Sequence, residues 1–300
     1  HLAGDASIAK AEYSGLAWYK DWLILLPQYP DKFDNHIFAI SKDEINSYIP
    51  SESTYQITPK EIKVDFPKNF EKQFPGYEGL EAIAFSGNQV YLTVEAEKKD
   101  NIRGYVTKGE IDDAAMEIKL DRHPEAVLKP QTDISNFSEE ALLISGNLIY
   151  TIYEANGADL NSYPKMHVLS RIDGTVDVIP FPNIEYRITD ATELDDHNIF
   201  WVMNYLWPGD REDLYTGKDV LIEKYGSGET HSKSEAVERI IECKIEDGRV
   251  KLTNRAPIYL QLNEGVSHNW EGIVKFDNRG FLIITDKYPD TILAFVPYKL

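Results

Sequence analysis

Residues 80–94 read Leu80-Glu-Ala-Ile-Ala-Phe-Ser-Gly-Asn-Gln-Val-Tyr-Leu-Thr-Val94, and their pattern returns four more times along the chain. A short apolar run follows Glu81, a Ser-Gly-Asn turn comes next, and a second apolar run contains Tyr91, ten residues after Glu81. Gly and Asn supply the positive φ that tight hairpins need, so this stretch predicts a β-hairpin. A hairpin that recurs along the chain indicates a protein built from repeats.

Each copy places an oxygen-bearing residue before Gly or Ala, and a second apolar run lies ten residues further on. The copies begin at Tyr13-Ser-Gly-Leu-Ala, Leu80-Glu-Ala-Ile-Ala, Glu139-Glu-Ala-Leu-Leu, Thr189-Asp-Ala-Thr-Glu and Trp270-Glu-Gly-Ile-Val. The spacing therefore aligns five equivalent positions: Ser14, Glu81, Glu140, Asp190 and Glu271. Glu78-Gly-Leu also matches the motif, and the ten-residue count alone favours Glu81 over Glu78.

Two more strand-like runs follow the hairpin in the first four copies, and four antiparallel strands are typical of a propeller blade. The last copy offers three strands before the sequence ends, and residues 7–12 are predicted to supply the fourth. The sequence thus predicts an all-β chain, a single domain over residues 1–300, folded as a five-bladed β-propeller closed by the N-terminal strand. The long insertion at 207–235 is predicted to form a flap over one face.

The first strand of each blade lines the axis of a propeller, so the five aligned positions are predicted to meet in one channel. Four carboxylates crowded together repel one another, and a hard cation would relieve that repulsion. Calcium accepts six to eight oxygen ligands, so Ser14, Glu81, Glu140, Asp190 and Glu271 are predicted to hold a calcium ion. The alternative is that the five residues are ordinary polar residues at the starts of strands, where they cap the strand or are solvated.

The order Ser, Glu, Glu, polar, Glu along five blades, with the forms Glu81-Ala-Ile, Glu140-Ala-Leu and Glu271-Gly-Ile, resembles the calcium-activated nucleotidases, or apyrases. The resemblance implies a five-bladed fold, a calcium ion in the channel and hydrolysis of nucleoside di- and triphosphates. Asp190 stands where that family has Ser, and the family's acidic-Arg signature in the first blade is absent. The last blade, Glu271-Gly-Ile followed by Ile283-Ile-Thr-Asp, is also similar to the phytase-like esterase propellers of bacteria.

Loops between the second and third strands of each blade are predicted to form a rim above the calcium. Aromatic and basic side chains near this rim are the candidate substrate-binding residues: Tyr29, Lys98, Arg187, Tyr205, Trp207, Lys287 and Tyr288. Beside a calcium ion, Glu95 or Glu154 could act as the base in hydrolysis of phosphate esters or nucleotides. Two alternatives stay open, which are a glycosidase that uses two channel carboxylates, and a non-catalytic propeller that binds a glycan or a protein.

The net charge and the lengths of the apolar runs limit which classes of partner the protein is expected to bind. A formal charge of −19 opposes binding to nucleic acid or to an anionic bilayer, and no apolar run approaches a membrane span of about 20 residues. We expect a small-molecule or glycan ligand and a monomeric chain. The single cysteine, Cys243, is predicted to be a buried core residue. The sequence starts without Met, so we expect a removed leader and an extracytoplasmic location.

Overall fold

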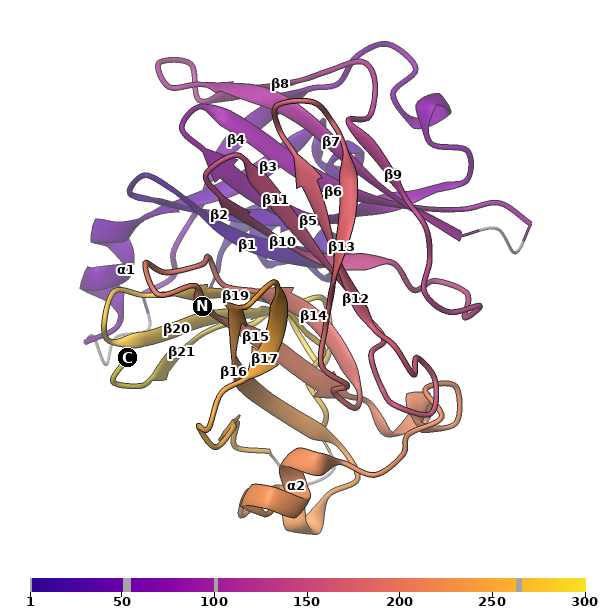
Figure 1. Ribbon diagram of the computed structural model, residues 1–300. Coiled ribbons are helices and arrows are strands. Elements are labelled where there is room, and N and C mark those ends of the chain that lie inside the picture. The colour runs from indigo at the N-terminus through magenta and orange to yellow at the C-terminus, as the bar shows by residue number, and fades with distance from the viewer. Residues whose placement is uncertain (1, 51–54, 100–101, 263–265) are drawn as a thin grey trace.

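A computed structural model describes residues 2–50, 55–99, 102–262 and 266–300 of the chain, and its strands form five consecutive antiparallel units (Figure 1). Unit 1 contains β1 (Tyr13–Tyr19), β2 (Trp22–Pro27), β3 (His36–Ser41) and β4 (Lys60–Asp65). Unit 2 contains β5 (Tyr77–Ser86), β6 (Gln89–Glu97), β7 (Ile102–Asp112) and β8 (Glu117–Leu120), with β9 (Ala126–Leu128) paired to β7. Unit 3 contains β10 (Glu139–Ser145), β11 (Leu148–Tyr153), β12 (Lys165–Ser170) and β13 (Val176–Pro180).

Units 4 and 5 contain the remaining strands of the chain that the structure describes. Unit 4 contains β14 (Arg187–Ala191), β15 (Ile199–Leu206), β16 (Val237–Glu246) and β17 (Arg249–Leu252), with β18 (Ile258–Tyr259) paired to β16. Unit 5 contains β19 (Trp270–Lys275), β20 (Gly280–Thr285) and β21 (Leu293–Pro297). The helices are short: α1 (Lys42–Tyr48), α2 (Val220–Tyr225), and the 3-10 turns η1 (Gly4–Ser7), η2 (Ala9–Ala11), η3 (Pro30–Phe33), η4 (Glu71–Gln73), η5 (Pro208–Arg211) and η6 (His231–Lys233).

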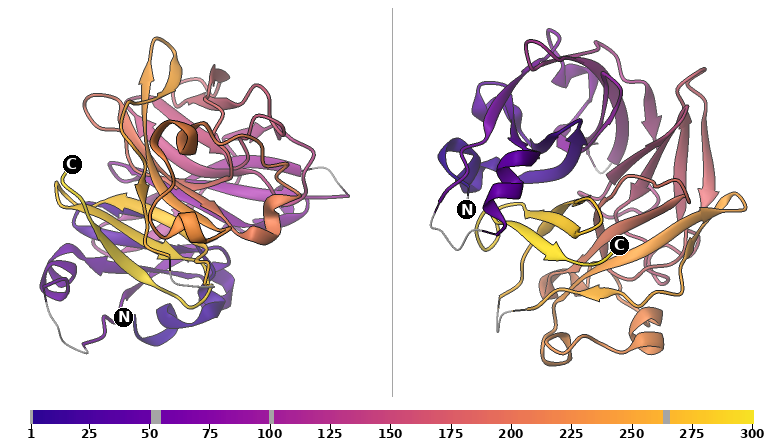
Figure 2. Two further views of the ribbon diagram at one scale, coloured as in Figure 1. Left: turned by 90° about the horizontal axis from the view of Figure 1, so that it is seen from below. Right: turned by 90° about the vertical axis from the view of Figure 1, so that its left-hand side faces the viewer.

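Apolar cores between neighbouring units hold the units in a closed ring. Both faces of the inner strands are apolar, so each sheet packs against a unit on either side. Separate clusters join units 1 and 2, 2 and 3, 3 and 4, and 4 and 5, and a further cluster joins unit 5 back to unit 1. At that last junction Trp18 stacks on Phe276 with ring centroids 5.9 Å apart, and its indole N–H donates to the Lys275 carbonyl at 2.7 Å. Figure 2 shows the strands of unit 5 against those of unit 1.

The prediction that residues 7–12 form the closing strand is wrong. These residues lie in η1, η2 and the turn after them, where Glu12 has a φ of 41°, and the sheet of unit 5 keeps three strands. The run Ala9-Lys-Ala lacks the β-branched and aromatic residues that favour a strand. The segment closes the ring through packing instead, because Leu2, Ala6 and Ala11 are buried in the core shared by units 1 and 5.

Units 1 and 2 also join at their outer edges, which the sequence analysis did not foresee. β4 pairs with β8 in parallel, and Lys63 Nζ lies 2.7 Å from Glu117 Oε1 across this pairing. The two units therefore form one continuous nine-stranded sheet, and the pairing covers an edge that would otherwise be open.

The insertion at 207–235 contains η5, α2 and η6 and is anchored to unit 4. Arg239 is fully buried, and its Nη1 lies 2.8 Å from Asp219 Oδ2. The other carboxylate oxygen of Asp219 accepts from the backbone N–H groups of Leu221 and Ile222 and so caps α2. Leu221 then packs into the core between units 3 and 4, so α2 lies outside the sheets (Figure 1). The turn η5 comes near the axis, where Asp210 Oδ2 lies 3.6 Å from Arg187 Nη1.

One smaller prediction can be compared with the structure. Cys243 is fully buried in the core between units 3 and 4, which confirms its assignment as a core residue. Within the part of the chain that the structure describes, no helix is long and apolar enough to cross a membrane.

Candidate active site at the axis of the ring

A β-bulge near the start of each first strand creates the ring of axial side chains. Where each first strand pairs with the second, the register shifts by one residue and leaves one residue opposite no partner. A bulge of this kind redirects a side chain away from the regular alternation of the strand. The bulged residues are Ser14 in β1, Glu81 in β5, Glu140 in β10, Thr189 in β14 and Glu271 in β19.

Four of the five residues that we aligned lie around one cavity of about 210 Å³, which we call the axial cavity. Ser14, Glu81, Glu140 and Glu271 line it, and each is buried. Glu78 lies at a second bulge of β5 and does not line the cavity, so the structure favours Glu81 as the ring residue. The other lining residues are Glu12, Tyr13, Gln28, Glu95, Asn136, Arg187, Asn269, Asp286 and Lys287.

In unit 4 the predicted alignment is displaced by one residue. Thr189, not Asp190, is the bulged residue, and its hydroxyl donates to the Trp270 carbonyl at 2.5 Å. Ser14 makes the equivalent contact in unit 1, where its hydroxyl donates to the Leu80 carbonyl at 2.6 Å. In both cases the acceptor residue directly precedes a ring glutamate. The turn after β14 is longer than the Gly-Asn turns of units 2 and 3, so the ten-residue count selected the wrong position.

The Asp190 side chain accepts hydrogen bonds from the backbone and does not line the cavity. Its Oδ2 accepts from the N–H groups of Ile273 at 2.8 Å and Leu16 at 3.4 Å, while Oδ1 accepts from the N–H of Ala191 at 2.8 Å. Burial raises the pKa of Asp190 well above its ordinary value, and the three backbone donors oppose that shift. Asp190 therefore ties β14 to the first strands of units 5 and 1.

Small residues after the bulge let the first strands approach one another. A Cβ on Gly272 would lie 2.8 Å from Leu16 Cγ and 2.7 Å from Ile284 Cγ2, which is closer than packed carbon atoms come. A Cβ on Gly15 would lie 3.4 Å from the Glu81 carbonyl oxygen. Crowding at the axis thus explains the glycine of unit 5, whereas the space at Gly15 would admit a Cβ in ordinary contact.

Arg187 supplies a positive charge to this acidic cavity. Its Nε donates to Glu154, its Nη2 lies 3.8 Å from Glu271 Oε1, and its Nη1 lies 3.6 Å from Asp210 Oδ2 in η5. Burial disfavours the charge, but Glu154 and Glu271 raise the pKa of Arg187 above its already high value. Glu154 is completely buried behind this arginine and does not itself line the cavity.

The cavity carboxyl groups bind protons more tightly than isolated ones. Burial raises the pKa of Glu81 to about 7, although Gln28 Nε2 donates to its Oε1 at 2.9 Å. Burial and the neighbouring Glu81 raise the pKa of Glu95 to about 9, and its buried Oε1 has no hydrogen-bond partner among the described residues. Burial raises the pKa of Glu154 to about 7 against the influence of Arg187.

The two remaining ring carboxyl groups behave in the same way. Burial raises the pKa values of Glu140 and Glu271 well above the ordinary value. Neighbouring glutamates, Glu154 first, raise that of Glu140 further, whereas Arg187 opposes the shift of Glu271. The ring glutamates therefore hold their protons to a higher pH than isolated glutamates do.

The candidate substrate-binding residues divide into two sets. Arg187 and Lys287 line the cavity, and Lys287 Nζ lies 2.9 Å from Glu12 Oε1. Tyr29 and Tyr205 lie close to it: burial and the nearby Glu81 raise the pKa of Tyr29 to about 12, and the Arg187 guanidinium lies 5.9 Å from the Tyr205 ring centre.

The second set lies away from the cavity. Lys98, Trp207 and Tyr288 are exposed and do not line it.

Several cavity residues were missed by the sequence analysis. Gln28, Asn269 and Asp286 adjoin the predicted strands, and Asp286 even falls in the Ile-Ile-Thr-Asp run that was singled out. Their position next to the first or second strand of a unit was the available signal.

The donor chemistry of the cavity suits calcium. Carboxylate and hydroxyl oxygens are ligands that calcium prefers. Among the described residues, however, no three or more Asp, Glu, His or Cys side chains are grouped so as to hold a metal ion. Arg187 already provides a cation within this cluster of glutamates.

Comparisons with known proteins identify the fold. No family model matches the chain, and no curated protein sequence is similar to it. An α-L-arabinanase mutant of Cellvibrio cellulosa superposes with a TM-score of 0.52 at 11% identity over 98% of this chain and 92% of that one. An exo-1,5-α-L-arabinanase from a bovine ruminal metagenomic library gives 0.49 at 8% identity, covering 98% and 92%. A GH32 β-fructofuranosidase of Bombyx mori gives 0.48 at 11%, covering 93% and 56%. The first similarity, together with the ring of sheets, shows that the chain is a β-propeller.

Proposed function

We propose that the axial cavity is the active site of a glycoside hydrolase, in which one buried carboxyl group donates a proton and another accepts one. The observation that carries this proposal is that Glu95 and Glu81 line one cavity, where burial raises their pKa values to about 9 and about 7. Two carboxyl groups in one site with separated pKa values are the usual arrangement for acid and base catalysis. A structural neighbour that superposes with a TM-score of 0.52 is an arabinanase, which is consistent with this chemistry.

The roles follow from the protonation states. Glu95 is protonated at neutral pH and would donate its proton to the glycosidic oxygen as the C–O bond to the sugar breaks. Glu81 is partly ionised and would take a proton from the water that attacks the sugar carbon. The proton given by one carboxyl group is thus balanced by the proton taken by the other. Arg187 keeps Glu154 and Glu271 in place beside this pair.

The charge of the cavity favours a neutral substrate. Glu12, Glu81, Glu95, Glu140, Glu271 and Asp286 line it, whereas its cationic lining residues are Arg187 and Lys287. A phosphate ester would meet more negative than positive groups there unless a metal ion intervened. A sugar carries no charge and offers hydroxyl groups to carboxylate and amide acceptors.

Hydrolysis of glycans tests this proposal directly. We would incubate the protein with aryl glycosides and with arabinan, xylan and β-glucan, in the presence of EDTA, and measure reducing ends. We expect turnover by the wild type, and a loss of at least about 100-fold in Glu95→Gln and Glu81→Gln. A Glu61→Gln variant is the matched control, since Glu61 is exposed on β4 and does not line the cavity. Absence of turnover on every substrate, or full activity of both cavity variants, would overturn the proposal.

A calcium-dependent phosphate-ester or nucleotide hydrolase is the second candidate, supported by the excess of carboxylates in the cavity. Ser14, Glu81, Glu140 and Glu271 would be the ligands, and Thr189 is placed where Asp190 was expected. Native mass spectrometry with added calcium tests it: one bound calcium that is lost in Glu140→Gln, together with calcium-dependent phosphate release from ADP, would favour this candidate over the glycosidase. Without turnover on either substrate class, a binding propeller remains. Export and a monomeric state also remain predictions.

A further inference from the structure

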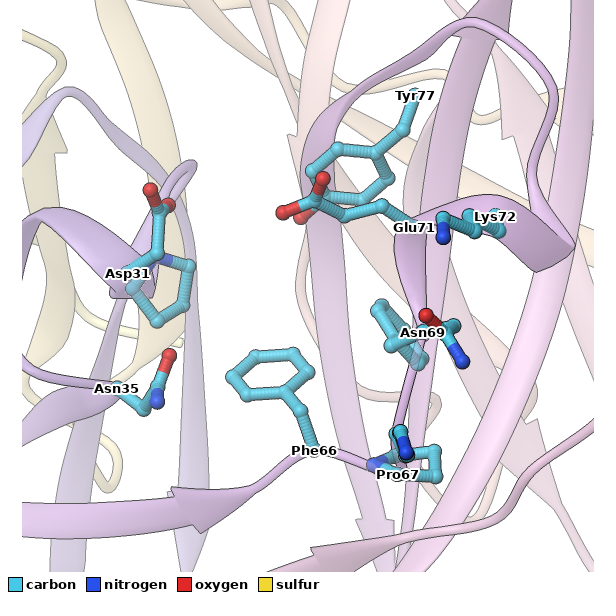
Figure 3. Close-up of a pocket in the computed structure, with 11 residues that line it drawn as sticks. Asp31, Asn35, Phe66, Pro67, Asn69, Glu71, Lys72 and Tyr77 are labelled. Atoms are coloured by element: carbon cyan, nitrogen blue, oxygen red, sulfur yellow. The ribbon is translucent and has the colours of Figure 1, made fainter.

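A second cavity has a volume of about 400 Å³, and we call it the lateral pocket. It lies between η3 of unit 1 and the segment that leads from β4 through η4 to β5. Figure 3 shows Asp31 and Asn35 on one wall, Glu71 and Tyr77 on the other, and the ring of Phe66 between them. The remaining lining residues are Pro30, Pro67, Lys68, Asn69, Phe70 and Lys72.

We infer that the lateral pocket is a second saccharide-binding site, which holds a sugar unit of the same glycan chain that enters the axial cavity. This inference rests on the proposed glycoside hydrolase function. The pocket combines a flat apolar surface with polar groups around it, and this combination suits a sugar ring, whose faces are apolar and whose edges carry hydroxyl groups.

The aromatic surface is rigid. Phe66 and Tyr77 are half-buried, and both pack edge-on against the buried Phe70, with ring centroids 5.0 Å and 6.2 Å away. Phe70 in turn packs against Phe74 at 4.8 Å. Because the rings are fixed before a ligand arrives, a sugar that stacks on them would lose little free energy to ordering of the protein.

The polar groups around this surface are available to a ligand. Asn35 and Asn69 have left-handed backbones, with φ of 62° and 60°, and both are exposed. Within the described residues, no hydrogen bond or ion pair engages the side chains of Asp31, Asn35, Asn69 or Glu71. Two carboxylates and two lysines, Lys68 and Lys72, leave the lining without a net charge, so a neutral ligand fits better than a phosphorylated one.

A short loop joins the lateral pocket to the axial cavity. Gln28 lines the axial cavity and donates to Glu81, while Pro30 and Asp31 of the same loop line the lateral pocket. Tyr77 lies at the start of β5, the strand that carries Glu81. Neighbouring units of one extended glycan could therefore occupy both cavities at once, so we assign the substrate class as an oligosaccharide or polysaccharide.

Binding measurements test the inference without relying on turnover. The probes are the tetrasaccharides of arabinose, xylose, glucose and N-acetylglucosamine and the matching monosaccharides, titrated calorimetrically into the Glu95→Gln protein. On this background we would compare Phe66→Leu, which removes the flat ring but keeps an apolar side chain, and Asn69→Gly, which keeps the left-handed backbone. We expect each variant to bind the best tetrasaccharide about three- to tenfold more weakly and the monosaccharide within about twofold.

Asp133→Ala is the matched control, because Asp133 is exposed and lines a different cavity of about 490 Å³. Amide chemical shifts of Asn35 and Asn69 should move with the tetrasaccharide and stay in place with the monosaccharide. Unchanged affinity in both pocket variants, or binding of no tetrasaccharide, would overturn the lateral site. Binding that weakens as expected, while the wild type cleaves no glycan, would support the pocket and refute the hydrolase.

Discussion

The first strand of unit 4 differs from the first strands of the other units in what it presents to the axis. β5, β10 and β19 each place a glutamate at the bulge, and β1 places a serine. β14 places Thr189 there, with Arg187 two residues before it and Asp190 directly after it. The first set supplies three of the acidic groups of the cavity, Glu81, Glu140 and Glu271. β14 supplies the cation that pairs with them and the carboxylate that ties three strands together.

This comparison shows that the repeated motif can place a carboxylate either in the cavity or against the backbone. The carboxylates of β5, β10 and β19 line the cavity and are available to a ligand, whereas Asp190 of β14 accepts hydrogen bonds from three backbone N–H groups. An acidic residue at an aligned position therefore does not by itself indicate a cavity residue, because the position of the bulge determines which side chain faces the cavity. Variants of β14 should lower stability most, and variants of the other strands should mainly change protonation and activity.

Replacement of Arg187 should have the largest effect on stability. Arg187→Met leaves Glu154 buried without its counterion, and breaking one side of a buried ion pair costs about 3–5 kcal/mol. Urea unfolding followed by intrinsic fluorescence measures the change in the free energy of unfolding. A second change, Glu154→Gln, should recover part of the loss because it removes the uncompensated charge. An Arg187→Met protein as stable as the wild type would show that the cavity needs no internal cation.

Replacement of Asp190 should come next. Asp190→Ala leaves three backbone N–H groups without their acceptor, and two or three unsatisfied buried donors cost about 3 kcal/mol. Asp190→Asn keeps one carbonyl oxygen and should lose roughly half as much. Calcium affinity, if the protein binds calcium, should change little in Asp190→Asn. A large loss of calcium affinity in Asp190→Asn with unchanged stability would instead show that Asp190 is a calcium ligand.

Protonation of Glu95 should make stability depend on pH. Because the folded pKa of about 9 lies above the unfolded value, the folded state holds this proton more tightly. Its stabilising contribution is fully present below about pH 4.5 and is lost as pH rises toward 9. Glu95→Gln removes this dependence, so the fall in unfolding free energy between pH 5 and 7 should shrink by about 2.5 kcal/mol. Glu81 and Glu154 titrate near 7 and should preserve the remaining slope. An identical pH profile in the variant would refute the assignment of Glu95 as the proton donor.

The sequence predicted the repeated units and most of the ring, because both follow from local patterns. Hairpin turns and apolar runs set the strands, and the glycine of unit 5 beside its ring position reflects crowding at the axis. Features that depend on distant contacts were not predictable. The pairing of β4 with β8 joins strands more than 50 residues apart, and the N-terminal segment packs where a strand was expected. Arg187 was taken for a rim residue because nothing local shows that Glu154 and Glu271 surround it.

The smallest effects should come from the two ring hydroxyls, and they test whether Thr189 is the true equivalent of Ser14. Each hydroxyl donates to the carbonyl that precedes a ring glutamate, at 2.6 Å from Ser14 and 2.5 Å from Thr189. Loss of one such hydrogen bond costs about 1 kcal/mol, so Ser14→Ala and Thr189→Val should lower the unfolding free energy by similar amounts. Because the two bonds lie on different pairs of strands, the double variant should show the sum of the single losses. Markedly unequal losses would mean that the two positions are not equivalent, and that the ring has lost its fivefold register at unit 4.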